Sequence, residues 1–525
     1  MTRLTVAAAW LVLSAACTKV PEAPVAPPIP PARIEWIHPT AAPDIDGAFA
    51  RARQDNQPLY LFWTAAWCPP CSQVKSTIFV RPDFIEKSRS FVPVYVDGDT
   101  ANGQLLGRRF SVTGYPTMVL LRPDGSEITR LAGSIDADKY MELLDQGLSG
   151  GSSARQALAA ALAGESVDPR DWRMLAYYSW EVDDQQLVKT DALSATMVRL
   201  AQRCPPQQRE SASRLTLQAI AAAAKDSKKA APLVAKADAL ASLRSILASP
   251  DLARVHYDLI VQYAADFVEF TTAAKSAARR QLEEELNAVL DRLAADATLS
   301  NAARVWAVSA KVDIARVDHK NEALPQSLLA QVREQAVWAD HATPDVEERQ
   351  SVITAAGSML ADAGLLDESD ALLTTELTRS HSPYYYMLGL ASNARQRKTP
   401  AGNAAAIDWA RQAYETSKGP ATRLQWGGAY VNTLIELAPT NGPGIETASA
   451  GIIDEAARTP DAYSGRSRRS LERLSQRLQK WNRNGTHDAV LARLHEKMSG
   501  VCASSIVEPA DRGDCTQLFA PGKHA

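Results

Sequence analysis

The sequence predicts an α/β domain followed by a long all-α region built from helix pairs. Between residues 34 and 148, short apolar runs alternate with amphipathic stretches, which is the pattern of alternating strands and helices. Beyond residue 153 the strand pattern stops, and helical stretches recur between short breaks at proline or glycine. Abundant alanine and an aromatic content of only 6% favour helix over sheet for most of the length.

Length and charge narrow the class of protein. The chain has 525 residues, too many for one hydrophobic core and enough for roughly three domains. The content of 46% hydrophobic and 22% charged residues is that of a folded protein. The 57 basic and 60 acidic residues give a net charge of −3, and no basic block is present, so we expect no nucleic-acid partner.

Residues 1–17 are typical of an export signal that ends at a cysteine. Arg3 precedes an apolar run over residues 4–13, which is too short to span a bilayer as a helix. Small residues then lead directly to Cys17, an arrangement that resembles the bacterial lipobox, whose cysteine is lipidated. An ordinary cleavable signal with an incidental cysteine is the alternative interpretation.

Residues 18–33 hold six prolines and no core pattern, which predicts an extended tether. With a lipid at Cys17, the protein is expected to be anchored in the bacterial cell envelope and to face the periplasm. Thr18 weakly favours the outer membrane, because an aspartate after the lipidated cysteine is the usual signal for inner-membrane retention.

The predicted α/β domain covers residues 34–148. LYLFW at residues 59–63 is an apolar run with aromatic residues, typical of a buried central strand. RPDG at residues 122–125 is a strong turn signal between two strands. The predicted strands cover residues 34–37, 59–63, 92–96, 117–121 and 128–131. The predicted helices cover residues 46–54, 72–79, a short stretch from Pro82, 104–110 and 136–148.

The stretch SGGSS at residues 149–153 predicts a flexible linker, and residues 154–525 form the predicted helical region. Helix pairs that start near Tyr384 and Ala421 indicate a repeat of roughly forty residues, in the solenoid range. Leu388-Gly389 faintly resembles a tetratricopeptide repeat, although no full consensus copy is present. The alternative is a generic α-helical domain that packs its apolar stripes.

The stretch WCPPC at residues 67–71 separates Cys68 and Cys71 by two prolines. Zinc usually needs four ligands, and neither a second such pair nor a suitably spaced histidine is present, so we expect no metal and no cofactor. A structural disulfide across so small a ring would stabilise little.

Disulfide exchange fits the WCPPC motif better. The motif follows a strand and opens a helix, where amides and the helix dipole stabilise the Cys68 thiolate. Cys71 would then resolve the mixed disulfide.

WCPPC after LYLFWTAA, with GYPT at residues 114–117, resembles the thioredoxin superfamily over about residues 34–148. The resemblance implies a thioredoxin-like fold with Cys68 and Cys71 as the catalytic pair. It implies a cis-proline at Pro116 and pairing of the Tyr115 backbone with a substrate chain. It also implies that Trp67 contacts substrate, and we expect this indole at the surface beside the thiolate.

Two departures from the thioredoxin pattern concern proton transfer. Phe62 stands where thioredoxins carry a buried aspartate, and residues 92–96 lack the lysine that partners it. Proton transfer from Cys71 must therefore use water or another group. Lys75 is within range on the same helix face, but its simpler interpretation is a solvated surface lysine. Trp63 is interpreted as core packing on the central strand.

The remaining cysteines have simpler predicted roles. Cys502 and Cys515 could close a short loop as a structural disulfide, since an exported protein lies where disulfides persist. Cys204 stands alone and is interpreted as a small buried apolar residue.

Two functions agree with these patterns. The first is an extracytoplasmic thiol–disulfide oxidoreductase that acts on protein clients, more a reductase fed by a membrane electron donor than an oxidase. The second is a helical protein-binding scaffold with a thioredoxin-like module of redox-sensing or structural role. Tyr384-Tyr385-Tyr386 could line a concave binding face, although ordinary packing between helices explains it as well.

Overall fold

The computed structural model describes residues 33–520, apart from positions 113, 132, 134, 181–182, 184–185, 227–232, 320–321 and 461. Residues from Ile34 onward form one compact unit. The predicted signal segment, the lipidation candidate Cys17 and the predicted tether up to residue 32 lie outside the described residues.

In the described residues, the α/β region is built on a four-stranded sheet with the strand order β2-β1-β3-β4. The central strand β1 (Leu59–Thr64) runs parallel to β2 (Val92–Asp97) and antiparallel to β3 (Thr117–Leu121). Strand β4 (Glu127–Leu131) pairs antiparallel with β3 at the edge. Every residue of β1 is buried, as expected of a strand covered on both faces.

Helices cover both faces of this sheet. They are α1 (Ala42–Asp55), α2 (Pro69–Thr77), α3 (Pro82–Lys87), α4 (Ala101–Arg109) and α5 (Ala137–Leu148), with a 3-10 turn η1 (Ser88–Ser90). Because side chains alternate along a strand, Leu61 and Trp63 pack with α1 and α4. Tyr60 and Phe62 point to the opposite face and pack with α2, α3 and α5.

The strand predicted at residues 34–37 is wrong: this segment makes a single bridge between Ile37 and Val94. The Ile37 amide donates to the Pro93 carbonyl at 2.9 Å, and the Ile37 carbonyl accepts from the Tyr95 amide at 2.9 Å. Pro39 has no N–H to continue the ladder, and α1 begins three residues later.

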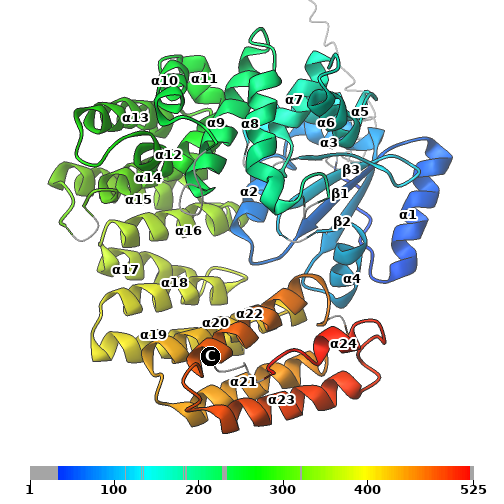
Figure 1. The fold of residues 1–525 in the computed structure, drawn as a ribbon, viewed down its shortest axis with the longest axis vertical. Helices are drawn as coiled ribbons and strands as arrows, with labels where there is room; N and C mark the ends of the chain where they lie inside the picture. The colour runs from blue at the N-terminus through cyan, green and yellow to red at the C-terminus, as the bar shows by residue number, and fades with distance from the viewer. Residues whose placement is uncertain are drawn as a thin grey trace, which may run out of the picture. The chain divides into compact units, whose positions relative to one another are not determined.

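The region after α5 is helical in the described residues, as the sequence predicts. Figure 1 follows these helices from cyan through green and yellow to red. They are α6 (Ala154–Ala163), α7 (Pro169–Tyr177), α8 (Leu193–Arg203), α9 (Arg209–Asp226), α10 (Lys236–Leu247), α11 (Pro250–Val255), α12 (Tyr257–Thr271), α13 (Ala277–Ala295), α14 (Asn301–Arg316), α15 (Gln326–Ala342), α16 (Val346–Asp362), α17 (Leu366–Glu376), α18 (Pro383–Gln396), α19 (Pro400–Thr416), α20 (Pro420–Leu437), α21 (Gly442–Ala456), α22 (Gly465–Trp481), α23 (Asp488–Ala503) and α24 (Arg512–Cys515), with a 3-10 turn η3 (Thr190–Ala192) before α8.

Local sequence explains where these helices begin. Ser153 caps α6 through its hydroxyl and forms a capping box with Gln156, while Asp345 caps α16. Helices α18, α19 and α20 each start with a proline in the first turn, where a missing N–H costs nothing. None of the described helices is long and apolar enough to cross a membrane.

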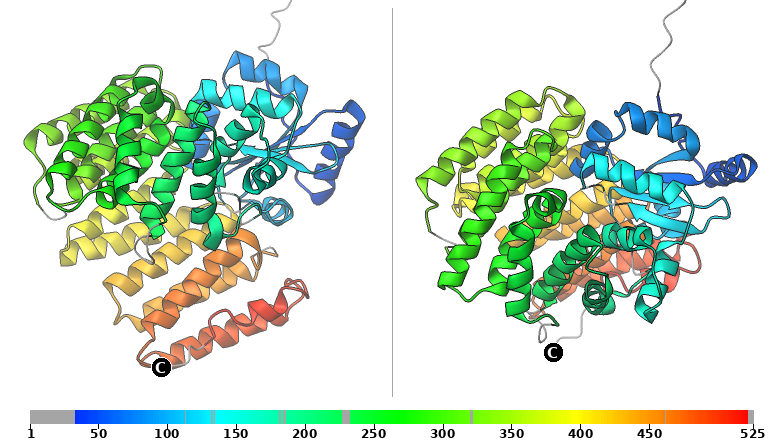
Figure 2. Two further views of the ribbon diagram at one scale, coloured as in Figure 1. Left: turned by 45° about the horizontal axis from the view of Figure 1, so that its top comes forward. Right: turned by 90° about the horizontal axis from the view of Figure 1, so that it is seen from above.

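The helical region packs onto the thioredoxin-like region through a shared apolar core. The cluster that contains Tyr60 and Leu144 continues into Trp172 of α7 and Leu200 of α8, and it includes Trp426 of α20. Figure 2 shows the cyan-to-teal helices that begin the helical region beside the sheet in both views. Each such large side chain contributes about 1.5–3 kcal/mol by leaving water, so this shared core ties the two regions together.

Candidate active site

The two cysteines of WCPPC lie at the start of α2, directly after the carboxyl end of β1. Cys68 is the N-cap residue of α2, and its sulfur accepts a hydrogen bond of 3.2 Å from the Cys71 amide. Pro69 and Pro70 fill the first turn of the helix, where no backbone donor is lost. A thiolate at Cys68 would therefore be stabilised by a backbone amide and by the positive end of the helix dipole.

Cys68 and Cys71 form a disulfide with their Cα atoms 5.2 Å apart. Both cysteines are buried: Cys68 is 2% exposed and Cys71 is fully covered. Residues from the helical region provide part of this cover. Gln350 of α16 donates to the Trp67 carbonyl at 3.2 Å, and the His381 ring lies 2.8 Å from the Ala66 carbonyl.

Trp67 connects the cysteine loop to the helical region. Its indole Nε1 lies 2.9 Å from the Asp99 carboxylate and 2.7 Å from the Thr422 hydroxyl. Its ring stacks on Tyr385 at 6.0 Å and meets Trp426 edge-on at 4.7 Å. The expectation of a surface indole is wrong, because helices α18 and α20 cover Trp67 and leave it 7% exposed.

Asp99 is a site residue that sequence reasoning missed. It follows β2, the strand parallel to β1, so its position at the carboxyl edge of the sheet beside the motif was a usable signal. Burial raises the pKa of Asp99 to about 6, against the hydrogen bonds from Thr422 and Trp67, which lower it. Gly419, at the start of α20, lies so close that a Cβ there would be 2.8 Å from the Asp99 side chain.

Tyr115 and Pro116 lie on the loop beside the cysteine pair, and the peptide bond between them is cis. The Tyr115 hydroxyl donates to the Gly98 carbonyl at 3.0 Å and accepts from Gln104 at 2.9 Å. The peptide N–H and C=O of Tyr115 have no partner among the described residues. An extended chain placed alongside could pair with this free backbone edge.

Phe62 and Lys75 are the two positions that bear on proton transfer from Cys71. Phe62 is fully buried and packs edge-on against Phe79 at 4.8 Å. Lys75 is not a solvated lysine, since it makes a 2.9 Å ion pair with Glu347 of α16. Burial opposes ionisation of Glu347, but Lys75 and Ser72 together hold its pKa below the ordinary value.

Cys68 lines a cleft of about 610 Å³ between the thioredoxin-like region and the helices. Cys68, Pro70 and Tyr115 line one side. The opposite side comes from α16, α17, α18, α20 and α22, and it includes Tyr385, Trp426 and Arg466. A cleft of this size matches the volumes of sites that hold small ligands or short chain segments. We call it the dithiol cleft.

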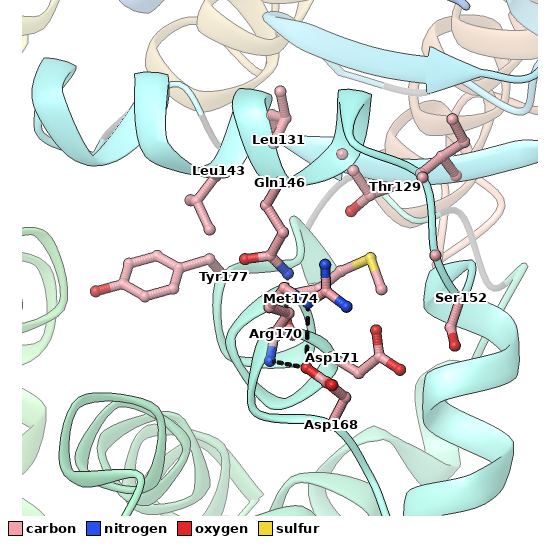
Figure 3. A pocket seen from close by; sticks show the side chains of 14 residues that line it. Thr129, Leu131, Leu143, Gln146, Ser152, Asp168, Arg170, Asp171, Met174 and Tyr177 are labelled. Carbon is pink, nitrogen blue, oxygen red and sulfur yellow. Dashed lines mark hydrogen bonds and ion pairs between the residues drawn. The ribbon is translucent and has the colours of Figure 1, made fainter.

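A second cavity, of about 230 Å³, lies between β4, α5 and α7 and is lined by neither cysteine. Figure 3 shows Leu143, Met174 and Tyr177 around it, with Arg170 bonded to Asp168 at its rim. The Asp168–Arg170 contact is exposed and local, and no cysteine or histidine of the described residues lines the space.

The other cysteines occupy separate places. Cys502 of α23 and Cys515 of α24 form a disulfide in the structure and are buried among apolar side chains of the last helices. Cys204, at the end of α8, is buried and unpaired, and burial raises the pKa of its thiol to about 12. Among the described residues, no cluster of three or more potential ligands could hold a metal ion.

The fold and this site define a thioredoxin-like domain, and comparison with known proteins agrees. A family described as "Thioredoxin-like domain" matches residues 45–148. The same region is 33% identical over 103 residues to the thiol:disulfide interchange protein DsbD of Pseudomonas fluorescens, covering 19% of this chain and 18% of that protein.

Plant and bacterial thioredoxins match as well. Thioredoxin H5 of Arabidopsis thaliana is 28% identical over 97 residues, which cover 18% of this chain and 76% of that protein. The solution structure of a thioredoxin from Thermus thermophilus is 30% identical, covers 19% of this chain and 81% of that structure, and has a TM-score of 0.18. The chain thus spans under a quarter of the DsbD proteins that it matches, and these likenesses concern the thioredoxin-like domain.

Proposed function

We propose that this protein is an extracytoplasmic thiol–disulfide oxidoreductase that reduces disulfides in protein clients. One observation carries the proposal: Cys68, which is disulfide-bonded to Cys71, caps α2, and Cys68 and Tyr115 both line the dithiol cleft. The names of the matching relatives, thiol:disulfide interchange protein and thioredoxin, support the same class of reaction.

In the reducing direction, the Cys68 thiolate attacks one sulfur of a client disulfide. A bond between Cys68 and the client forms, the client disulfide breaks, and the released client sulfur takes up a proton. The Cys71 sulfur then attacks Cys68, so the Cys68–Cys71 bond forms and the second client sulfur leaves and is protonated. The client gains two electrons, and an external dithiol donor must return two electrons to the protein.

The cellular setting is part of the proposal. A signal ending at Cys17 would place the protein in the bacterial envelope on a lipid anchor, facing the periplasm, with the outer membrane favoured by Thr18. There the electrons would come from a membrane-bound dithiol donor. The helices beyond residue 153 would hold the client near Cys68 and raise its effective concentration.

A trapping experiment with the full-length chain tests this function. The Cys71→Ser variant should accumulate mixed disulfides with client proteins through Cys68, while the Cys68→Ser variant should form none. Reduction potentials of the pair near about −270 mV would agree with a reductant, and values near about −120 mV would indicate an oxidant. Failure of the wild-type chain to exchange with any disulfide would refute the enzymatic function.

The burial of Cys68 favours one alternative. Because this sulfur is almost entirely covered, the pair could serve as an internal redox-sensing module of a helical protein-binding scaffold. The Cys68→Ser variant separates the two functions in cells. An enzyme loses its function with this change, whereas a scaffold keeps most of it.

A further inference from the structure

Arg466, at the start of α22, places a positive charge in the dithiol cleft beside the cysteine pair. Its guanidinium lies over the Trp67 ring, 5.3 Å from the centroid, and over the Tyr115 ring at 4.7 Å. Both aromatic residues flank Cys68 and also line the cleft. Arg466 is thus held by the residues expected to contact substrate.

Among the described residues, the hydrogen-bond partners of the Arg466 guanidinium include no carboxylate. Its guanidinium donates two hydrogen bonds to the neutral side-chain oxygen of Gln425, at 2.6 and 3.2 Å. No carboxylate of the described residues lies within ion-pair distance of it. A half-buried guanidinium normally finds a carboxylate, since charge-assisted bonds are the strong ones.

The charged groups around Arg466 leave room for the carboxylate of a bound client. Burial lowers the pKa of Arg466, and the neighbouring Arg473 and Arg469 lower it further. Asp99 opposes this effect from a distance, but its two oxygens already accept from Trp67 and Thr422. The other charged side chain that lines the cleft in the described residues is Asp362, at the end of α16.

We propose that Arg466 selects clients in which a carboxylate lies next to the reacting cysteine in an extended peptide segment. This inference rests on the proposed function and adds a substrate class to it. Two features of the cleft favour a peptide: the Tyr115 backbone, which has no partner among the described residues, can pair with an extended chain, and the half-buried ring of Tyr385 offers apolar contact beyond it. Arg466 supplies the charge that complements the acidic side chain.

The test uses full-length reduced protein and two short peptides whose cysteine carries a mercaptoethanol disulfide. The peptides differ only in Glu or Gln beside the cysteine, and the rate constant of exchange is measured by stopped-flow tryptophan fluorescence. The Glu peptide should react about ten-fold faster, the scale of one charge-assisted hydrogen bond. The preference should fall as ionic strength rises. An equal rate for the two peptides would overturn the inference.

Variants on one helix locate the effect. In Arg466→Gln the preference should fall to about one, and in Arg466→Lys most of it should remain. Arg468→Gln is the matched control, because Arg468 lies two residues away and pairs with Glu472 and Asp514. It should keep the full preference. A preference that survives in Arg466→Gln would overturn the inference, and if this variant does not fold, Arg466→Lys and the wild-type peptide comparison still decide.

Two further disulfide substrates distinguish failure of the Arg466 inference from failure of the proposed function. Oxidised glutathione carries carboxylates on a chain too short to pair as a strand, so a rate equal to that of the Glu peptide would overturn the assignment to an extended peptide segment. Neutral hydroxyethyl disulfide reports the proposed function alone. If no disulfide reacts, the proposed function fails, whereas exchange without any preference for charge refutes the role of Arg466.

Discussion

The indole Nε1 of Trp67 lies 2.7 Å from the hydroxyl of Thr422, although 355 residues separate them in the chain. The same Thr422 hydroxyl donates to Asp99, which also accepts from Trp67. Three residues from two regions thus form one buried hydrogen-bonded group beside Cys68. The helical region is therefore a structural component of the cysteine site.

Replacing Thr422 by valine should destabilise the protein by about 1.5–3 kcal/mol, because a buried carboxylate loses a hydrogen bond. Urea unfolding measures this cost. Thr433→Val on the same helix is the matched control, since among the described residues the Thr433 hydroxyl bonds only to the helix carbonyl of Ala429, and it should change stability by less than about 0.5 kcal/mol. Equal effects of the two changes would contradict a special role for Thr422.

Stability should depend on pH through Asp99. Because burial raises the pKa of Asp99 from its ordinary value of 3.8 to about 6, the folded protein binds this proton more tightly than the unfolded chain. The resulting stabilisation is present in full below about pH 4 and is lost as the pH rises through about 6. The wild type should lose about 2–3 kcal/mol relative to Asp99→Asn across this window. Parallel curves of unfolding free energy for the two proteins would show that Asp99 does not titrate there.

Gly98→Ala should displace Tyr115, because a Cβ at position 98 would lie 2.1 Å from the Tyr115 hydroxyl oxygen. Overpacking of this kind costs about 1–3 kcal/mol, and the rate of disulfide exchange should fall with it. Gly47→Ala in α1 meets nothing within 4 Å and should stabilise the helix by about 0.5–1 kcal/mol. Thermal unfolding and exchange assays compare the two variants. An unchanged exchange rate in Gly98→Ala would argue against substrate contact at Tyr115.

Replacing Cys502 and Cys515 together by alanine should lower stability by about 3 kcal/mol, because their disulfide closes a loop with a sequence separation of 13. The exchange rate of the Cys68–Cys71 pair should stay unchanged, since neither residue lines the dithiol cleft. Urea unfolding and stopped-flow exchange measure the two effects separately. A loss of exchange without a loss of stability would contradict a structural role.

Local patterns were sufficient to predict the order of elements in the α/β region from α1 onward. The apolar run of β1, the turn at residues 122–125 and the proline at the start of α2 each act within a few residues. The strand predicted at residues 34–37 did not form because Pro39 interrupts pairing. The prediction followed the apolar residues of this segment and gave no weight to the proline.

The covering of the site could not be predicted in the same way. Thr422, Gln350 and Arg466 carry no motif, and their closeness to Trp67 depends on how many helices stack between them. Trp67 was expected at the surface because the resemblance to thioredoxins places this tryptophan beside the thiolate and the substrate. The error thus comes from tertiary packing, which neither periodicity nor spacing encodes.

The distance along the chain between Trp67 and Thr422 also orders events during synthesis. A chain made from its N-terminus at about 5–20 residues per second needs tens of seconds to extend from Trp67 to Thr422. During that interval the cysteines have left the ribosome while α20 and α22 do not yet exist. The cover that α20 and α22 give to the cysteine site can therefore form only after most of the chain has been made.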